Sequence, residues 1–328
     1  MLGMAKHSLF AANPTGAIGG FCYFGGAAPT LSTIFRYEIA NDAVTNNLTL
    51  ITGTGSSATG INTGKANGVA FGNGTLGYWG GGQTDSPGTD HVTLGYSSRA
   101  MKMTLADESK TAANNLSIYF RNSCGTCNDS TGIRMGGYLS TANSNNNANI
   151  WLYSWSSDAW SSNGSTLANP MSTVGIHSIT EFAYRASGYN EQSAAANIRY
   201  VNKWTWATSA LSSVATVLDE QMGYASCSGN QTDVVIMGGA NSSAAIIARV
   251  KSIVMATDTR TNRTNLAAGI LGNGDAAGDD VVGIHNFDRA ASGFTRKYTY
   301  STGSHVQSTQ LRSTDIQVNR AYHSIQVS

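Results

Sequence analysis

The sequence predicts an all-β protein. Glycine makes up 37 of the 328 residues, about 11% against roughly 7% in an average chain. Asn, Ser and Thr supply most of the remaining polarity, and these residues favour turns and loops over helices. Apolar and aromatic residues alternate with polar ones over short runs, which is the pattern of half-buried strands. Only the stretch 209–221 is ambiguous, so we expect strands joined by tight turns along the chain.

A repeat of about 50 residues organises these strands. Its first landmark is a short apolar string that ends in paired glycines. The copies begin their glycine pairs at Gly25, Gly81, Gly136 and Gly238, with a degenerate copy at 182–189 and a weak one at 281–285. The first two intervals are 56 and 55 residues, and the third, of 102, corresponds to two periods. A shared period is the signature of a repeat architecture.

A second landmark follows each glycine string with the same period. It consists of alternating apolar residues, then a small residue, then Ser, Thr or Asn. The copies lie at 34–41, 92–98, 150–157, 203–208, 251–258 and 296–302. The turn before the glycine string also repeats, as Gly-Asn-Gly at 72–74 and at 272–274. Each unit therefore reads as strand, turn, strand, turn.

The units have room for four strands each, since segments such as 48–51 and 69–71 supply two more. A small antiparallel sheet cannot bury either face alone, but blades stacked around an axis bury both. We therefore predict a β-propeller of about six four-stranded blades, with seven possible if the tail after Thr302 holds another copy. The glycine pairs are expected on the innermost strands, where blades crowd together.

The whole chain, 1–328, is expected to form a single propeller domain. Its repeats fall near 18–67, 68–122, 130–176, 177–226, 231–270 and 278–328. Closing the ring requires the N- and C-terminal strands to share a blade, and the apolar segment 6–12 is expected to complete the last one.

Charge and composition exclude several classes of protein. Twenty basic and nineteen acidic residues give a net charge of +1, which is too little to neutralise a phosphate backbone, so nucleic acid is not an expected partner. No stretch approaches the roughly eighteen uninterrupted apolar residues that a membrane helix needs, and Lys6 and His7 interrupt the N-terminal run 2–12, so no insertion into a membrane is expected. Four cysteines are too few for a disulfide framework in a chain of this length.

The glycine strings carry a resemblance. Double glycines after an apolar strand, with aromatic residues at a fixed offset, resemble kelch-type β-propeller repeats. The pattern Gly-Tyr-Trp-Gly-Gly-Gly at 77–82, with the Ile-Val-Met-Ala-Thr-Asp string at 253–258, is similar to repeats in structural and fibre proteins of tailed bacteriophages. The resemblance covers roughly 18–302. It implies a non-enzymatic virion protein on a tail, fibre or capsid surface.

Enzymatic alternatives find little support in the sequence. The six histidines are scattered, with no two at the spacing of a shared metal. Kelch-type copper oxidases need a Tyr and a Cys close together with two histidines, and Cys22 and Cys227 lie near inner strands. We nevertheless expect these cysteines to be buried small hydrophobes. The arginines show no recurrence that would suggest sialidase-like chemistry. No catalytic residue, cofactor or metal site is expected, and the chain is predicted not to be an enzyme.

Cys124 and Cys127 form a Cys-x-x-Cys motif, which could be redox-active or half of a zinc site. A second such motif and a βαβ pattern are both absent. We therefore expect a loop between adjacent blades, clasped by a local disulfide between the two residues.

Five aromatic residues are candidate ligand contacts. These are Trp151, Tyr153, Trp155, Trp204 and Trp206. If exposed, such rings would form a platform for stacking sugar rings. In a propeller, however, both faces of each sheet are buried, so blade-to-blade core is the favoured interpretation.

These observations favour a structural virion protein with a host-attachment role. Its expected partners are other virion proteins, further copies of itself in a homo-oligomer, and a host surface glycan or receptor. The alternative is a secreted lectin-like propeller that binds carbohydrate. A multivalent lectin should repeat its polar pocket residues from blade to blade, whereas the positions that repeat here belong to packing and turns.

Overall fold

A computed structural model shows how the repeated strands are arranged. It describes residues 21–25, 33–49, 68–82, 92–93, 96–116, 120–121, 123–139, 148–168, 175–188, 199–214, 218–241, 243, 245–267, 269, 276–287, 294–308 and 323–326. These residues contain strands and turns but no helix, and accordingly none that is long and apolar enough to span a membrane. The predicted all-β fold is confirmed.

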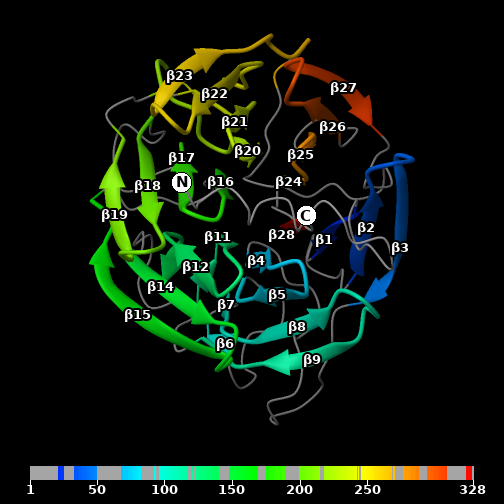
Figure 1. Cartoon of the computed structure of the whole chain (residues 1–328). Coiled ribbons are helices and arrows are strands. Elements are labelled where there is room, and N and C mark those ends of the chain that lie inside the picture. Colours follow the sequence, from blue (N-terminus) through cyan, green and yellow to red (C-terminus); the bar gives the residue numbers. More distant parts are fainter. Residues whose placement is uncertain are drawn as a thin grey trace, which may run out of the picture.

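Six four-stranded antiparallel sheets stand around a common axis as the blades of a propeller (Figure 1). Blade 1 contains β1 (Phe21–Gly25), β2 (Thr33–Glu38), β3 (Ala43–Thr49) and β28 (His323–Gln326). Blade 2 contains β4 (Val69–Gly72), β5 (Leu76–Gly80), β8 (Ala100–Thr104) and β9 (Lys110–Ala113). Blade 3 contains β11 (Cys124–Cys127), β12 (Thr131–Met135), β14 (Asn149–Ser154) and β15 (Ala159–Thr166).

The second half of the ring follows the same plan. Blade 4 contains β16 (Gly175–Ser178), β17 (Phe182–Ala186), β18 (Val201–Thr205) and β19 (Ala210–Ser213). Blade 5 contains β20 (Ser226–Gly229), β21 (Asp233–Met237), β22 (Val250–Val254) and β23 (Thr259–Asn262). Blade 6 contains β24 (Ala276–Gly278), β25 (Val282–Phe287), β26 (Phe294–Thr299) and β27 (Ser304–Ser308).

A further small sheet is formed by β6 (Val92–Thr93), β7 (Tyr96–Ser97), β10 (Phe120–Arg121) and β13 (Tyr138–Leu139). Its strands come from connections within and between blades 2 and 3, and they are only two residues long. This sheet is therefore an addition to those two blades rather than a seventh blade.

The ring is closed by a different terminal strand from the one expected. β28 pairs with β1 in antiparallel register, with Cys22 opposite Gln326. Blade 6 draws four strands from 276–308. The N- and C-terminal parts of the chain thus share blade 1 rather than the last blade. The segment 6–12 lies outside the described residues.

The innermost strands pack closely around the axis. Each contacts its two neighbours, in the order β4, β11, β16, β20, β24 and β28. A Cβ added to Gly125 would lie 1.9 Å from Val69 Cγ2, and one added to Gly175 would lie 2.3 Å from Cys227 Cβ. Small residues on these strands are therefore required by the packing between blades.

The glycine pairs lie elsewhere than expected. They end or follow the second strand of a blade rather than occupying the innermost strand, and Gly81, Gly136 and Gly238 all have positive φ near 70°. Ser187 takes the same conformation in the degenerate fourth copy. The pair is thus a strand-ending turn, which glycine adopts at low cost.

A second turn motif joins the first and second strands of a blade. In four blades an Asx side chain accepts hydrogen bonds from the backbone amides two and three residues further on. These acceptors are Asn73, Asn128, Asn230 and Asp279. The turn at 72–74 is confirmed, 272–274 lies outside the described residues, and Asp279 is the turn residue in blade 6.

A charged repeat ties neighbouring blades together. The turn between the third and fourth strands holds one residue with positive φ in each blade, namely Asp42, Glu108, Asp158, Ser209, Asp258 and Gly303. Three of these carboxylates bind a cation on the third strand of the preceding blade, a contact that we call the seam ion pair. The pairs are Arg36 with Glu108 at 2.7 Å, Lys102 with Asp158 at 2.7 Å, and Lys203 with Asp258 at 3.2 Å.

Two seams lack this charge on both sides. Where the turn residue is Ser209 or Gly303, the position of the cation holds Leu152 or Ser252. The cation and the carboxylate are therefore either both present or both missing at these positions. This matching avoids leaving a half-buried charge without a counter-ion.

Apolar clusters fill the spaces between the blades. Tyr78, Phe71 and Tyr153 pack between blades 2 and 3. Cys22 and Tyr37 of blade 1 meet Ile284 of blade 6 at the closing seam. The core is thus distributed over the seams, as a propeller requires.

Candidate functional site

The five candidate aromatic residues do not form one exposed platform. Tyr153 and Trp204 are fully buried. The Tyr153 ring lies 4.8 Å from that of Tyr78 and 5.2 Å from that of Trp160, between blades 2 and 3. Trp204 belongs to the cluster between blades 3 and 4. Both residues therefore serve as blade-to-blade core.

The other three aromatic residues are partly buried. Trp155 contacts the edge of Tyr153, with ring centroids 5.2 Å apart. Trp206 packs against Trp204 and donates its Nε1 hydrogen to the carbonyl of Ile179. Trp151 lies on β14, opposite Arg134. These side chains are divided between two seams, so they do not offer one sugar a common stacking surface.

Cys124 and Cys127 lie at the two ends of strand β11, and both are free thiols. An extended strand separates Cα atoms three residues apart by about 10 Å, whereas a disulfide needs less than about 7 Å. The Cys127 thiol instead donates to the carbonyl of Gly72 at 2.9 Å. Burial raises the pKa of both thiols. The expected local disulfide is therefore not formed, and the segment is a strand rather than a loop.

The most elaborate buried polar group surrounds His285 on β25. Its Nδ1 lies 2.7 Å from Ser226 Oγ and its Nε2 lies 2.8 Å from Ser228 Oγ, both on β20. Tyr300 donates to Ser228 Oγ at 2.9 Å. Burial lowers the pKa of His285 to about 3. The imidazole is thus a neutral link between blades 5 and 6, enclosed by protein.

Histidine and cysteine side chains are the ones best suited to hold a transition metal. In the part of the chain that the structure describes, no three His, Cys, Asp or Glu side chains are grouped so that they could hold a metal ion. Burial raises the pKa of Cys22 and of Cys227, so both thiols are held in their neutral form. Buried, neutral thiols of this kind act as small packing residues.

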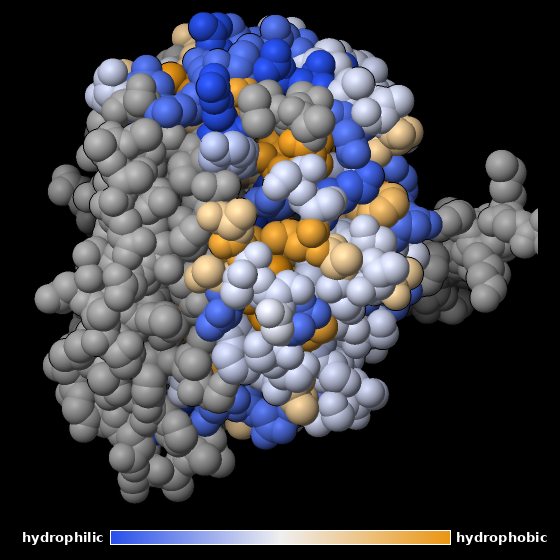
Figure 2. All heavy atoms as spheres, turned by 90° about the vertical axis from the view of Figure 1, so that its left-hand side faces the viewer, coloured by the Kyte–Doolittle hydropathy of each residue, from blue (hydrophilic) through white to orange (hydrophobic). Residues whose placement is uncertain are grey.

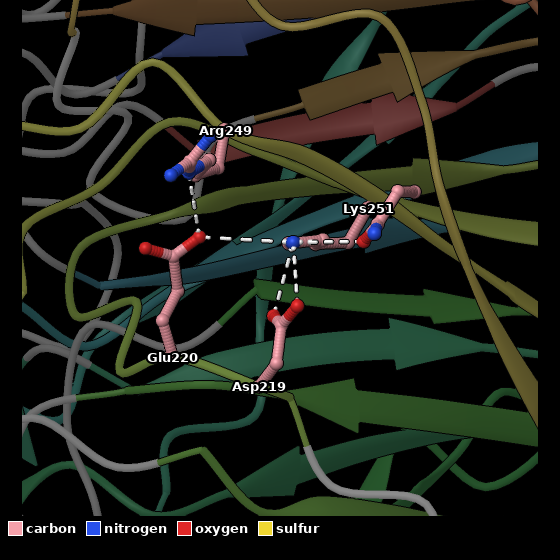
Figure 3. A pocket seen from close by; sticks show the side chains of 5 residues that line it. Asp219, Glu220, Arg249 and Lys251 are labelled. Atoms are coloured by element: carbon pink, nitrogen blue, oxygen red, sulfur yellow. Dashed lines mark hydrogen bonds and ion pairs between the residues drawn. The ribbon is translucent and has the colours of Figure 1, made fainter.

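One solvent-accessible pocket has a lining of functional groups. It lies where blades 4 and 5 meet, has a volume of about 350 Å³, and is lined by Asp219, Glu220, Arg249, Lys251 and Asn262 (Figure 3). We call it the seam pocket. The two acids come from the link between β19 and β20, while Arg249 directly precedes β22, Lys251 lies in β22 and Asn262 ends β23. Its volume falls within the range of small-molecule sites.

Lys251 organises the seam pocket. Its side chain is only 6% exposed, and its Nζ lies 3.0 Å from Asp219, 2.8 Å from Asn262 Oδ1 and 3.7 Å from Glu220 Oε1. Arg249 Nε binds the same Glu220 oxygen at 3.0 Å. Partial burial opposes ionisation of Asp219, but the hydrogen bond and charge of Lys251, together with Arg260, hold its pKa below the ordinary value. The lining is therefore a fixed network of two acids and two bases.

The seam pocket was not predicted from the sequence. The signal that could have found it is a departure from the repeat. The position of Lys251 in the third strand holds Phe35, Met101, Trp151, Asn202, Lys251 and Arg296 in successive blades. The first three of these are apolar and the last three are polar, so the change of chemistry covers blades 4 to 6 and includes Lys251.

Comparison with known proteins does not assign the chain to a family. No protein-family model matches the chain, and no curated protein matches it significantly.

Proposed function

We propose that this propeller is a non-enzymatic structural protein of a tailed bacteriophage virion. It would be displayed on a tail, fibre or capsid surface and take part in attachment to the host. The proposal rests on the resemblance of the strings at 77–82 and 253–258 to repeats of phage structural proteins.

One structural observation supports a scaffold role above others. The positions that repeat around the ring are strand-ending glycines, Asx turns and seam ion pairs, and all of them hold the blades together. His285, a residue type that often acts in catalysis, is instead enclosed in a seam with both ring nitrogens hydrogen-bonded. The repeat therefore maintains a rigid ring whose rim is free to vary.

The surface composition is compatible with assembly in arrays. Charged residues account for only 12% of the chain, and the net charge is +1. Turn residues such as Asn128 and Asn230 carry polarity without charge. Many copies of such a surface can be placed side by side without strong mutual repulsion. We propose that the partners are other virion proteins and further copies of this chain.

Mass spectrometry of purified particles tests the proposal. Particles of the phage that encodes the chain are purified on a density gradient, and their peptides are quantified against the major capsid protein. We expect peptides of this chain at a fixed ratio to capsid peptides in independent preparations. Detection in the infected-cell lysate but not in particles would contradict a virion role and favour a separate secreted binding protein.

The lectin alternative makes a different structural demand. A propeller that binds sugars at every blade needs the same polar lining at every seam. At the position of Lys251 the chain holds an apolar residue in blades 1 to 3 but Asn202 in blade 4 and Arg296 in blade 6, so the same lining does not recur at every seam. A single binding site on a scaffold fits these observations better than a multivalent lectin does.

A further inference from the structure

We propose that the seam pocket binds a neutral sugar unit of a surface glycan, and this inference rests on the attachment role proposed above. The pocket is accessible from solvent, measures about 350 Å³, and is lined only by side chains that form hydrogen bonds (Figure 3). Each sugar hydroxyl is both a donor and an acceptor. A pocket that presents carboxylate acceptors beside guanidinium donors matches that chemistry.

The groups at the mouth of the pocket retain hydrogen-bonding capacity. Arg249 is 48% exposed and uses Nε for Glu220, while Figure 3 shows its terminal nitrogens turned away from that carboxylate. Glu220 binds both cations through one oxygen, and its other oxygen points away from both of them in the same view. A guanidinium donor and a carboxylate acceptor thus lie beside each other, which suits a pair of adjacent hydroxyls.

Charge balance selects a neutral ligand. Within the lining, Lys251 and Arg249 match the two carboxylates, and Arg260 Nη2 lies 3.8 Å from Asp219 Oδ2, so each carboxylate already has a cation beside it. A charged ligand would have to compete with one of these ion pairs. A neutral polyol has no such penalty, because it exchanges water hydrogen bonds for those of the fixed network.

The pocket is held in shape before any ligand arrives. Leu218 and Met222, which flank the two acids in sequence, are fully buried in the cluster between blades 4 and 5. Leu218 also donates its backbone N–H to the carbonyl of Arg199 at 2.9 Å. Because the acidic link is anchored at both sides, little conformational entropy is lost when a ligand binds.

An exposed aromatic residue lies next to this anchored link. Tyr200 follows Arg199, whose carbonyl accepts the hydrogen bond from Leu218, and it is 44% exposed. Large apolar or aromatic side chains with such exposure are few among the described residues. An exposed aromatic ring next to the link that carries the two acids provides a surface for the C–H face of a sugar. Figure 2, which views the side of the ring that includes blade 4, shows apolar atoms surrounded by polar ones on this side.

Binding by the isolated full chain tests the inference. The chain is applied to an array of neutral and acidic bacterial surface saccharides, and the strongest neutral saccharide is then titrated calorimetrically. We expect one site per chain. The substitutions Arg249→Ala and Glu220→Gln should each weaken binding at least tenfold, and Tyr200→Ala should weaken it while Tyr200→Phe retains it.

A matched control is available on the same blade pair. Glu181 is exposed and lies in the turn between β16 and β17, outside the pocket lining. Glu181→Gln makes the same chemical change as Glu220→Gln and should leave the affinity unchanged. Thermal melting of each variant checks that the ring is intact.

The outcomes separate the inference from the function on which it rests. Absence of neutral saccharide binding, binding confined to acidic saccharides, or binding insensitive to Arg249→Ala and Glu220→Gln would each overturn the inference. A chain that is present in purified particles but binds no saccharide would remain a virion protein without this site. A chain that binds through the seam pocket but is absent from particles would retain the site and lose the virion role.

Discussion

The seam ion pair between Lys102 and Asp158 should stabilise the contact between blades 2 and 3. Lys102 Nζ lies 2.7 Å from Asp158 Oδ2, and the two side chains are 20% and 26% exposed. Asp158 also accepts a hydrogen bond from Tyr153 at 2.6 Å. Exposed pairs contribute about 0.2–1 kcal/mol, and hydrogen bonds to charged groups about 1.5–3 kcal/mol. Because this pair is partly screened by solvent, we expect a coupling energy of about 1 kcal/mol.

A double-mutant cycle measures that coupling. Asp158→Asn keeps an acceptor for Tyr153 and a residue type that tolerates positive φ, so its main effect is loss of charge. We expect Asp158→Asn and Lys102→Met each to lower the free energy of unfolding by about 1–2 kcal/mol, and the double variant to lose about 1 kcal/mol less than their sum. Reversible urea unfolding gives all four values.

The neutral seam between blades 3 and 4 supplies the control. Ser209 occupies the same turn position, also with positive φ, but has Leu152 in place of a cation. Ser209→Asn should therefore change the free energy of unfolding by less than about 0.5 kcal/mol. A coupling energy near zero for the charged pair, or an equal loss at Ser209, would refute the stabilising role of the seam ion pair.

Three further predictions concern packing, thiols and pH. Gly175→Ala should destabilise the ring by about 2–3 kcal/mol, because the new Cβ meets both a side chain and backbone of β20. Gly164→Ala faces open space with a φ of +79° and should cost only about 1 kcal/mol, so equal melting temperatures would contradict the close inner packing. All four cysteines should react as free thiols in denaturant without reductant, and a count of two would show that a disulfide is present. Since the folded-state pKa of His285, about 3, lies below its unfolded value, stability should be complete above about pH 6.5 and fall as the pH drops toward 3. His285→Gln should make the loss of unfolding free energy between pH 7 and 5 smaller by roughly 2 kcal/mol, and an unchanged pH profile would contradict the buried neutral imidazole.

The propeller architecture could be predicted because each blade carries its own copy of the same sequence pattern. Similar strings recur with a fixed period at Gly81, Gly136 and Gly238 because every blade packs against its neighbours in the same way. The radial position of the glycines could not be obtained in this way. A period gives the spacing of a residue type but not which strand of the blade it ends, and that is decided by the pairing of β5 with both β4 and β8.

The strand that closes the ring, β28, could not be predicted from its own residues. The segment His323–Gln326 has only one strongly apolar residue, and its partner β1 lies about 300 residues earlier in the chain. The Cys-x-x-Cys segment was expected to be a loop but is a strand, for a related reason. Cys124–Cys127 contains no β-branched apolar residue, and it becomes a strand because Thr131–Met135 pairs with it. In both cases tertiary pairing overrides weak local propensity.

The candidate site also has one part that the sequence predicts and one part that it does not. Burial of Tyr153 and Trp204 in the seams followed from the propeller architecture, in which both sheet faces are covered. The seam pocket did not, because Lys251 meets acids that lie some 30 residues earlier, in a link between blades. Contacts between residues that do not belong to the repeat produce no periodic pattern in a single sequence.

Closure of the ring through β28 is the claim on which the six-bladed architecture depends, and one engineered disulfide tests it directly. Cys22 lies opposite Gln326 in the antiparallel register, and directly opposed positions of an antiparallel pair have a spacing that a disulfide can bridge. We expect Gln326→Cys to form an intramolecular disulfide with Cys22 under mild oxidation, detected as a linked peptide by mass spectrometry. Position 325 is opposite Tyr23 instead of Cys22, so the neighbouring variant Ile325→Cys should remain unlinked. Failure of Gln326→Cys to link, or equal linking by Ile325→Cys, would contradict the closed ring.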